Sequence, residues 1–441
     1  MKKIAIATLG CKVNQYESAA FSSAFTQAGC EMVSFSGKAD VYVINTCSVT
    51  GRAGQQSRQL IRRAMKANPE AKLVVTGCYA QMEANHILDI VDTPVCIVGN
   101  GNKHLLVETA LADSTADLSM LMGNIGLKQE ITSLPVRRFP GRTRAYLRIQ
   151  DGCNNFCSYC IVPYTRGRSR SMSLKQILEQ VTIFAEEGYR EIVITGINVG
   201  KYGLDLKENE TIYSLITRMC RDFPTIRFRL SSIELTEVDD RLLAMLTELA
   251  NFMPHLHIPL QSGDDRILER MNRRYSAGDF ARVITMIHKT LPHGAIGCDI
   301  LCGFPGESDR AFTNGLDLVA SLPLTYFHVF PYSRRPGTLA ASMKDQIAKP
   351  VKDERVRQLR QLSLEKREEF YRSHVGTVQQ VLVERHNKQT GHLQGFSENY
   401  LAVQFTGPPK LAGTVVRVRI DRFLDGELFG SRDHSPLEIM E

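Results

Sequence analysis

The sequence lacks long apolar runs. No stretch of its 441 residues approaches the roughly 20 uninterrupted apolar residues that cross a bilayer, and the opening MKKIAIATLGC holds too short an apolar run for a secretory signal. Internal repeats and low-complexity tracts are missing as well. These absences predict a folded cytoplasmic protein that makes no contact with a membrane.

The composition is that of an ordinary globular protein with a basic excess. The chain is longer than one hydrophobic core usually supports, and 43% of its residues are hydrophobic, so about two to four domains are expected. The formal net charge of +7 suits a polyanionic partner without requiring one. Eleven cysteines in a chain without an export signal favour metal or redox chemistry over disulfides, because the cytosol keeps thiols reduced.

The first part of the chain alternates strand-like apolar runs with amphipathic helices. This pattern is typical of a parallel α/β sheet, and we expect a Rossmann- or flavodoxin-like domain over residues 1–125. A polar stretch from Asp113 to Pro135 is expected to lead to the next domain. The expected strands are Lys3–Leu9, Val41–Asn45 and Lys72–Thr76, and the expected helices are Tyr16–Ala28 and Gln55–Ala67.

From Arg144 the alternation resumes over a second, longer region. Six βα units are too few for a closed eight-stranded barrel, so we expect an open, partial (βα)6 TIM-like barrel over residues 138–371. The expected strands are Ala145–Ile149, Glu191–Thr195, Arg227–Leu230, His255–Pro259, Ala295–Leu301 and Tyr326–Phe330. The expected helices are Leu174–Glu187, Asp239–Leu249, Phe280–Thr290 and Asp309–Ser321.

The last part of the chain changes character again. A charged helix is expected over Lys352–Tyr371, followed from Ser373 by short runs of Val, Phe and Leu broken by Gly and Pro. We expect residues 372–438 to form a small antiparallel β-barrel of the OB-like kind.

Three cysteines, Cys153, Cys157 and Cys160, share one polar loop with the spacing CxxxCxxC. Three thiolates can hold three corners of a [4Fe–4S] cluster and leave the fourth iron open, whereas a zinc site normally takes four protein ligands. The open iron could chelate S-adenosylmethionine, whose reductive cleavage yields a 5′-deoxyadenosyl radical. The alternative, three unrelated structural cysteines, fits poorly with a polar Asn/Ser-rich loop directly after a strand.

A second group of cysteines lies upstream. Cys11, Cys47 and Cys78 each follow directly after an expected strand, and in a parallel sheet all three would emerge at the same edge. They form a plausible second iron–sulfur site, the alternative being three unrelated loop cysteines. The other cysteines lie in apolar runs or helices and are expected to be structural, namely Cys30, Cys96, Cys220, Cys298 and Cys302.

The triplet resembles the signature of the radical S-adenosylmethionine (radical-SAM) superfamily. That resemblance implies cofactor contacts from the triplet loop and from successive strand ends, where such barrels carry their active sites. Glycine-rich strand ends that merely turn the chain are the alternative. The residues expected to contact the cofactor are Tyr159, Gly196, Asn198, Ser231, Ser232, Glu234, Gln261 and Asp299.

The motifs LGCKVN, NTC and TGC, placed ahead of CNNFCSYC and IVPYTRGRSRS, resemble the methylthiotransferase family along nearly the whole chain. The resemblance implies that Cys11, Cys47 and Cys78 bind an auxiliary [4Fe–4S] cluster that delivers sulfur. It also implies two molecules of S-adenosylmethionine, one that methylates the sulfur and one that yields the radical. The six cysteines of the two groups are therefore the expected catalytic and metal-binding residues, and a small-molecule sulfur source and an electron donor such as flavodoxin or ferredoxin are expected partners.

Basic residues crowd the sequence on both sides of the triplet. A polyanion such as RNA could dock there through phosphate contacts, and a solvated basic face is the alternative. The residues expected to contact RNA are Arg142, Arg144, Arg166, Arg168 and Arg170. The segment from Gly391 to Tyr400 resembles the TRAM domain, a nucleic-acid-binding barrel.

The start GCKVNQYES, together with DGCNN, looks most like the family branch that modifies C2 of N6-threonylcarbamoyladenosine 37 in the tRNA anticodon stem-loop. Leu235 departs from the proline that this branch usually carries after Ser-Ser-Ile-Glu. The alternatives are an isopentenyladenosine tRNA methylthiotransferase, a methylthiotransferase for a ribosomal-protein aspartate, and a non-catalytic iron–sulfur RNA-binding protein.

Overall fold

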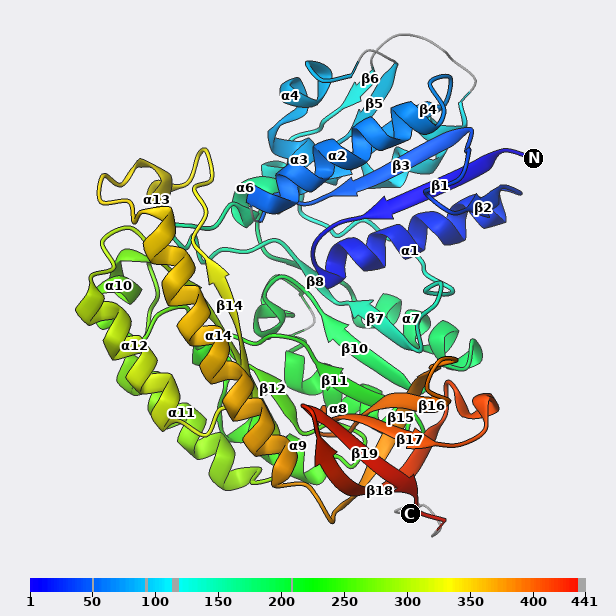
Figure 1. Ribbon diagram of the computed structural model, residues 1–441. Helices are drawn as coiled ribbons and strands as arrows, with labels where there is room; N and C mark the ends of the chain where they lie inside the picture. Colours follow the sequence, from blue (N-terminus) through cyan, green and yellow to red (C-terminus); the bar gives the residue numbers. More distant parts are fainter. Residues whose placement is uncertain (50, 92–93, 113–118, 208, 435–441) are drawn as a thin grey trace.

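The chain folds into three successive bodies that pack against one another (Figure 1). The computed structural model describes residues 1–441 apart from 50, 92–93, 113–118, 208 and 435–441. A parallel sheet comes first, a partial barrel follows, and a small closed β-barrel ends the chain. Among the helices of this described part, none is both long and apolar enough to cross a membrane.

The first body is a six-stranded sheet in the order β2-β1-β3-β4-β5-β6, in which every pair is parallel. Its central strands are buried on both faces, as the unbroken run VYVINT of β3 requires. The expected parallel sheet is confirmed. Its strands are β1 (Lys3–Thr8), β2 (Glu31–Val33), β3 (Val41–Thr46), β4 (Lys72–Gly77), β5 (Val95–Val98) and β6 (Ser119–Leu121).

The stretch expected to connect the first two domains, from Asp113 to Pro135, falls partly outside the described residues. Its described part contains β6, which extends the sheet beside β5, and the 3-10 turn η2 (Ile125–Leu127). A three-residue edge strand is too short to give a readable hydrophobic period, which is why the sequence did not predict it.

Helix α1 (Lys12–Gln27) joins the first body to the second. It packs against β1 of its own sheet and against β7 of the barrel, and its aromatic side chains Tyr16, Phe21 and Phe25 are buried in a core that both bodies share. The other helical segments here are α2 (Gly51–Ala67), α3 (Cys78–Met82), α4 (Ala84–Leu88), η1 (Asn100–Leu105) and α5 (Leu106–Leu111).

The second body is the expected open barrel. Two three-stranded parallel sheets, β11-β10-β7 and β12-β13-β14, meet through the bridges Phe228–Phe252 and Ser232–His257, which gives six parallel strands in one curved sheet. The carboxyl ends of these strands face the first body (Figure 1). The strands are β7 (Arg144–Arg148), β10 (Glu191–Thr195), β11 (Arg227–Leu230), β12 (His255–His257), β13 (Ala295–Cys302) and β14 (Tyr326–Pro331).

Helices cover the outside of this barrel, and several begin with reciprocal capping boxes. Each cap side chain accepts a hydrogen bond from a first-turn amide, and the side chain of the third helical residue accepts one from the backbone amide of the cap residue. The cap residues are Ser173, Thr211 and Ser276. The covering helices are α7 (Leu174–Glu186), α8 (Ile212–Asp222), α9 (Asp240–Glu248), α10 (Asp265–Arg270), α11 (Ala277–Thr290), α12 (Asp309–Ser321) and α13 (Leu339–Ser342).

The third body follows the long helix α14 (Lys349–Arg372) and is a closed barrel in the order β15-β16-β17-β19-β18. The expected small β-barrel is confirmed, with one difference. The last strand, β19, lies between β18 and β17. It is antiparallel to β18, which pairs with β15, and parallel to β17. The strands are β15 (Val378–His386), β16 (His392–Ser397), β17 (Ala402–Thr406), β18 (Val415–Leu424) and β19 (Glu427–Arg432), with η5 (Pro409–Leu411) between.

Two buried arginines of β11 attach the small closed barrel to the amino ends of the strands of the partial barrel. Arg227 donates to the carbonyl of Gln380 at 3.0 Å, and Arg229 donates to the carbonyls of Glu398 and Ser397 at 2.9 and 3.1 Å. The Arg229 guanidinium also lies over the ring of Tyr400, 5.0 Å from its centroid. Tyr400 therefore closes the base of the open barrel.

Candidate iron–sulfur active site

The cysteine triplet occupies the loop between β8 (Gln150–Asp151) and α6 (Val162–Arg166). β8 pairs with the short strand β9 (Arg170–Ser171), and the Cys153 amide donates to the Gly167 carbonyl at 3.1 Å, so the two ends of the loop are tied together. Gly152 has a φ of +73°, and a Cβ there would meet the Arg168 carbonyl oxygen at 2.0 Å. Only glycine fits this close approach of the two loop ends.

The three thiols of the loop lie near one another. Burial and, to a smaller extent, the adjacent Cys157 thiol raise the pKa of the Cys160 thiol to about 12. Burial and the same Cys157 neighbour also raise the pKa of Cys153. Cys157 is therefore the central member of the triplet.

Arg273 and Glu234 flank the triplet on the barrel side. The Arg273 guanidinium donates to the Cys157 sulfur at 3.4 Å and to a Glu234 carboxylate oxygen at 3.2 Å. Its Nε also donates to the Tyr275 hydroxyl at 3.0 Å. The Arg273 guanidinium therefore holds a positive charge against the triplet. Glu234 was expected at this site, whereas Arg273 gave no signal in the sequence.

Gln150 is a second residue that the sequence did not reveal. Its buried side-chain oxygen accepts from the amides of Ile197 and Asn198 at 2.9 and 2.7 Å, and its amide group donates to the Gly152 carbonyl at 2.7 Å. One side chain therefore holds the strand-end loop after β10 against the start of the triplet loop. Nothing in the sequence marks this role, because the two loops that Gln150 joins come together only in the fold.

The residues expected to bind the cofactor lie in three places. Asn198 hydrogen-bonds the Cys153 thiol, and half-buried Tyr159 lies next to Cys157, so both are at the triplet with Glu234. Gly196, Ser231, Ser232 and Gln261 lie in the loops after β10, β11 and β12 as expected. Asp299 lies deeper, where its carboxylate pairs with His257 Nε2 at 3.0 Å.

The upstream cysteines converge at the carboxyl edge of the first sheet. Cys11 caps α1 after β1, Cys47 follows β3 and Cys78 begins α3 after β4, and these three strands are adjacent. Burial, together with the neighbouring Cys78 and Cys11 thiols, raises the pKa of Cys47 to about 12. A Cβ on Gly10 would meet the Cys47 sulfur at 2.6 Å, so a glycine before Cys11 lets the second thiol approach.

Asparagine side chains lie behind two of these thiols. Asn14, buried in the first turn of α1, donates to the carbonyls of Leu9 and Thr46 at 2.7 and 2.9 Å, and its oxygen lies 4.0 Å from the Cys11 sulfur. Asn100 Nδ2 lies 4.0 Å from the Cys78 sulfur and donates to the Thr165 carbonyl of α6 at 2.7 Å. The loops that carry the two groups of cysteines are thus joined by direct contacts.

The donor type of both cysteine groups fits iron–sulfur clusters. Thiolates are the usual protein ligands of a [4Fe–4S] cluster, and each thiolate binds a different iron. Two all-cysteine triads, each leaving one corner of a cluster open, match that chemistry.

A buried ion-pair network connects the two triads. Arg166, which is 1% exposed, donates to Glu17 and to Asp151 at 3.1 and 3.0 Å and to the Asn14 side-chain oxygen at 2.6 Å. Lys103 pairs with the same Glu17. The charge on Arg166 also acts on the Cys11 and Cys78 thiols. Burial raises the pKa of Cys11, and the Arg166 charge reduces this increase. Asp151 directly precedes the triplet loop, and Asn14 and Glu17 lie on α1 just after Cys11. The Arg166 guanidinium therefore contacts residues beside both cysteine groups.

This network gives a stability prediction. Glu17→Gln keeps the shape of the side chain but leaves Lys103 and Arg166 short of a buried negative charge, which costs about 3–5 kcal/mol of unfolding free energy. Glu179→Gln removes an exposed partner of Lys175, 4.0 Å away, and is expected to cost less than about 1 kcal/mol. Chemical denaturation of both variants under nitrogen measures the difference. Equal losses would contradict a structural role for the Glu17 network.

The five arginines expected to contact RNA occupy different environments. Arg166 and Arg170 are buried, at 1% and 5% exposure, and pair with Asp151, so their guanidiniums do not face solvent. This position does not support the contact with RNA expected of them. Arg144 is half-buried and pairs with Glu384 at 2.7 Å, while Arg142 and Arg168 are exposed. The sequence shows where the basic residues lie along the chain but not which carboxylates the fold places beside them.

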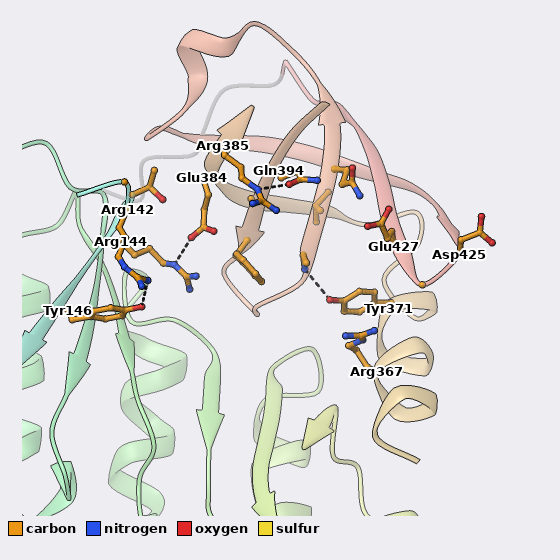
Figure 2. A pocket seen from close by; sticks show the side chains of 18 of the residues that line it. Arg142, Arg144, Tyr146, Arg367, Tyr371, Glu384, Arg385, Gln394, Asp425 and Glu427 are labelled. Carbon is orange, nitrogen blue, oxygen red and sulfur yellow. Dashed lines mark hydrogen bonds and ion pairs between the residues drawn. The ribbon is translucent and has the colours of Figure 1, made fainter. Parts of the chain in front are cut away.

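Arg142 and Arg144 line a cavity of about 720 Å³ between the start of β7, α14 and the small barrel (Figure 2). Arg142 donates to the Tyr146 hydroxyl at 2.9 Å, and Arg385 donates to Gln394 at 2.7 Å. Basic and acidic side chains share its wall, since Glu384, Asp425 and Glu427 also line it. The cavity lies at the amino ends of the barrel strands, at the opposite end from the cysteine triplet.

Comparisons with known proteins agree with this architecture. Sequence patterns described as the uncharacterized protein family UPF0004, the Radical SAM superfamily and the TRAM domain match residues 3–99, 147–319 and 372–431. Among solved structures, the radical S-adenosylmethionine methyltransferase TsrM from Kitasatospora setae aligns with a TM-score of 0.57 at 13% identity, covering 77% of this chain and 75% of that one. The partial barrel and its cysteine loop therefore define a radical-SAM protein.

Sequence relatives narrow the class further. The chain is 38% identical over 423 residues to "Threonylcarbamoyladenosine tRNA methylthiotransferase MtaB" of Bacillus subtilis, covering 95% of this chain and 94% of the relative. It is 36% identical over 419 residues to the protein of the same name from Aquifex aeolicus, covering 95% and 100%. A "tRNA-2-methylthio-N(6)-dimethylallyladenosine synthase" from Pelotomaculum thermopropionicum is 35% identical, covering 95% of each chain. The chain belongs to the methylthiotransferase family, and within it to the MtaB type.

Proposed function

We propose that the protein is a tRNA methylthiotransferase that replaces the C2 hydrogen of N6-threonylcarbamoyladenosine 37, next to the anticodon, by a methylthio group. The observation that carries this proposal is the similarity to MtaB proteins of several bacteria over 90% or more of the chain. The substrate is tRNA, and the reaction belongs in the cytoplasm, where tRNA is modified.

The two cysteine triads are proposed to hold two clusters, with Cys153, Cys157 and Cys160 at one and Cys11, Cys47 and Cys78 at the other. When bound, the first cluster with S-adenosylmethionine supplies a 5′-deoxyadenosyl radical, and the auxiliary cluster supplies methylated sulfur. Domain bounds of 1–125, 138–371 and 372–438 are proposed for the auxiliary-cluster, radical-SAM and TRAM domains.

The protein's own residues bind, orient and shield these groups. Arg273 keeps a positive charge 3.4 Å from the Cys157 sulfur, and Gln150 holds the loop after β10 against the triplet loop. Arg166 keeps a buried positive charge beside Cys11 and Cys78, and this charge partly offsets the increase that burial causes in the pKa of Cys11. Asn198, Glu234 and Tyr159 lie at the triplet and are proposed to orient S-adenosylmethionine there, with Gly196, Ser231, Ser232 and Gln261 on the neighbouring loops.

RNA contacts are proposed for the exposed basic residues. Arg168 lies next to the triplet loop with its guanidinium over the Phe156 ring, 4.7 Å from the centroid, and Arg142 lies at the rim of the cavity in Figure 2. Phosphate contacts of this kind give affinity without sequence specificity. A flavodoxin or ferredoxin as electron donor and a small-molecule sulfur source complete the proposed partners.

Nucleoside analysis of tRNA from a deletion strain tests the function. We expect 2-methylthio-N6-threonylcarbamoyladenosine to disappear and N6-threonylcarbamoyladenosine to accumulate, with recovery when the wild-type chain, but not Cys157→Ala, is supplied. Loss of methylthio-isopentenyladenosine instead would assign the activity named for the Pelotomaculum relative. Unchanged methylthio-adenosines would contradict any tRNA substrate.

A further inference from the structure

The inner face of the barrel is open to solvent along β14. Along β14, His328 and Phe330 point inward and are exposed, whereas the alternate residues Phe327 and Val329 are 4% and 6% exposed and pack outward, where α14 runs alongside the strand. In a closed barrel the inward row would be filled by side chains. Solvent therefore reaches this inner face of the barrel, the lumen.

Polar aromatic residues line this lumen. The imidazole rings of His257 and His328 stack with centroids 5.5 Å apart, and His255 Nε2 lies 2.8 Å from the Tyr326 hydroxyl. Tyr400 of the small barrel forms the floor, with its ring centroid 4.6 Å from that of His255. Asp299, paired with His257, is the acidic member of this wall.

One lysine enters the lumen from the first body. Lys12 is the first residue of α1, directly after Cys11, and its half-buried ammonium interacts electrostatically with Tyr400, Arg144 and Asp299 and with the rings of His255 and His328. No hydrogen bond or ion pair within the described residues joins this ammonium to a carboxylate. Asp299 is already engaged by His257.

We infer that Lys12 binds the carboxylate of the threonylcarbamoyl group and so selects this substrate over neutral N6-substituted adenosines. The inference rests on the proposed function. Adenine C2 must approach the cysteine sites at the mouth of the barrel, and the threonylcarbamoyl group leaves the ring at C6, on the other side of N1. Its carboxylate then ends several bonds away from C2, within reach of a flexible four-carbon side chain that starts beside Cys11.

Charge favours this occupant of the lumen. An ammonium in a partly desolvated site gains most from a carboxylate, and an unpaired partner there is costly. A second possible source of a carboxylate is the methionine moiety of S-adenosylmethionine. That group is expected at the triplet, where Asn198 and Arg273 lie, rather than beside His328 and Tyr400.

The experiment uses the reconstituted, anaerobic holoenzyme and two anticodon stem-loop RNAs. One carries N6-threonylcarbamoyladenosine at position 37, and the other carries the same nucleoside as its neutral methyl ester. The enzymes are the wild type, Lys12→Met, Lys12→Arg and the control Lys175→Met, whose side chain is 86% exposed on α7. The readouts are the dissociation constant of each RNA, kcat/KM for methylthiolation, 5′-deoxyadenosine formation and iron content.

We expect the wild type to prefer the acid RNA by about 10- to 100-fold, the range for a hydrogen bond between charged groups. Lys12→Met should lose this preference by weakening only the acid RNA, Lys12→Arg should keep a part of it, and Lys175→Met should behave as the wild type. Iron content should stay at the wild-type level in all four proteins.

Other outcomes overturn the inference in distinguishable ways. Equal losses on both RNAs in Lys12→Met would mean that the lysine supports the fold or the auxiliary cluster. A raised requirement for S-adenosylmethionine, with RNA discrimination intact, would assign Lys12 to that cofactor. A wild type that methylthiolates both RNAs equally refutes the inference alone, whereas a wild type that modifies neither refutes the proposed function and the inference with it.

Discussion

Cys157→Ala is expected to abolish the formation of 5′-deoxyadenosine. Cys157 is the central thiol of the triplet, since it raises the pKa of both Cys153 and Cys160 and accepts a hydrogen bond from Arg273 at 3.4 Å. Two remaining thiols hold a four-iron cluster poorly, so the iron content should fall from about eight to about four per chain. The loss of activity should exceed the roughly 10- to 100-fold that follows removal of a group behind a metal ligand.

The loop itself should survive this substitution, which makes the result interpretable. The Ser158 amide donates to the Met271 carbonyl at 3.0 Å and the Cys153 amide to the Gly167 carbonyl at 3.1 Å, and neither bond involves the Cys157 side chain. Cys30→Ala, which changes a half-buried cysteine after α1, is the matched control and should keep full activity. Wild-type amounts of 5′-deoxyadenosine from Cys157→Ala would remove the triplet from the radical-forming site.

The sequence predicted which cysteines meet, and the reason is topological. Cys11, Cys47 and Cys78 are far apart along the chain, but each follows a strand, and strands with parallel neighbours end at one edge. The first sheet and the partial barrel were predicted from alternating strand-like and helical segments, and the small β-barrel was predicted from short apolar runs broken by Gly and Pro. Short edge strands such as β2 and β6, with three residues each, carried too few residues to be predicted.

The burial of individual arginines could not be predicted in this way. Arg166 and Arg170 lie in a strongly basic segment, and nothing local distinguishes them from the exposed Arg168. The partner that buries Arg166 is Glu17, 149 residues earlier in the chain, and a pairing at that distance has no sequence period. Gln150 and Arg273 were missed for the same reason, because each acts on a loop that only the fold brings near.

The role of Lys12 could not be predicted from the sequence either. The sequence drew attention to its neighbour Cys11, but the direction of the lysine side chain depends on α1 starting at the mouth of the barrel (Figure 1). Its surroundings come from five separate segments, namely β7, β12, β13, β14 and the loop that carries Tyr400. A substrate-selecting role for it can therefore be argued only from the folded chain.

Cys47→Ala is expected to separate the two halves of the reaction. Cys47 is 5% exposed, packs against Gly10 and lies close to both other thiols of its group, so alanine removes one ligand of the auxiliary site with little change in packing. The triplet lies on a different loop and should keep its cluster. We therefore expect 5′-deoxyadenosine formation near the wild-type level, about four irons per chain and no methylthiolated RNA.

The pair of cysteine variants decides whether two clusters with different tasks exist. Cys96→Ala, at a 2% exposed position in β5 of the same sheet, is the matched control for Cys47→Ala and should leave sulfur insertion intact. If Cys47→Ala methylthiolates RNA at the wild-type rate, the auxiliary site is wrongly assigned. If it also fails to form 5′-deoxyadenosine, the two sites are not independent. The Arg166 network contacts residues beside both cysteine groups, so it is the physical route by which a change at one site would affect the other.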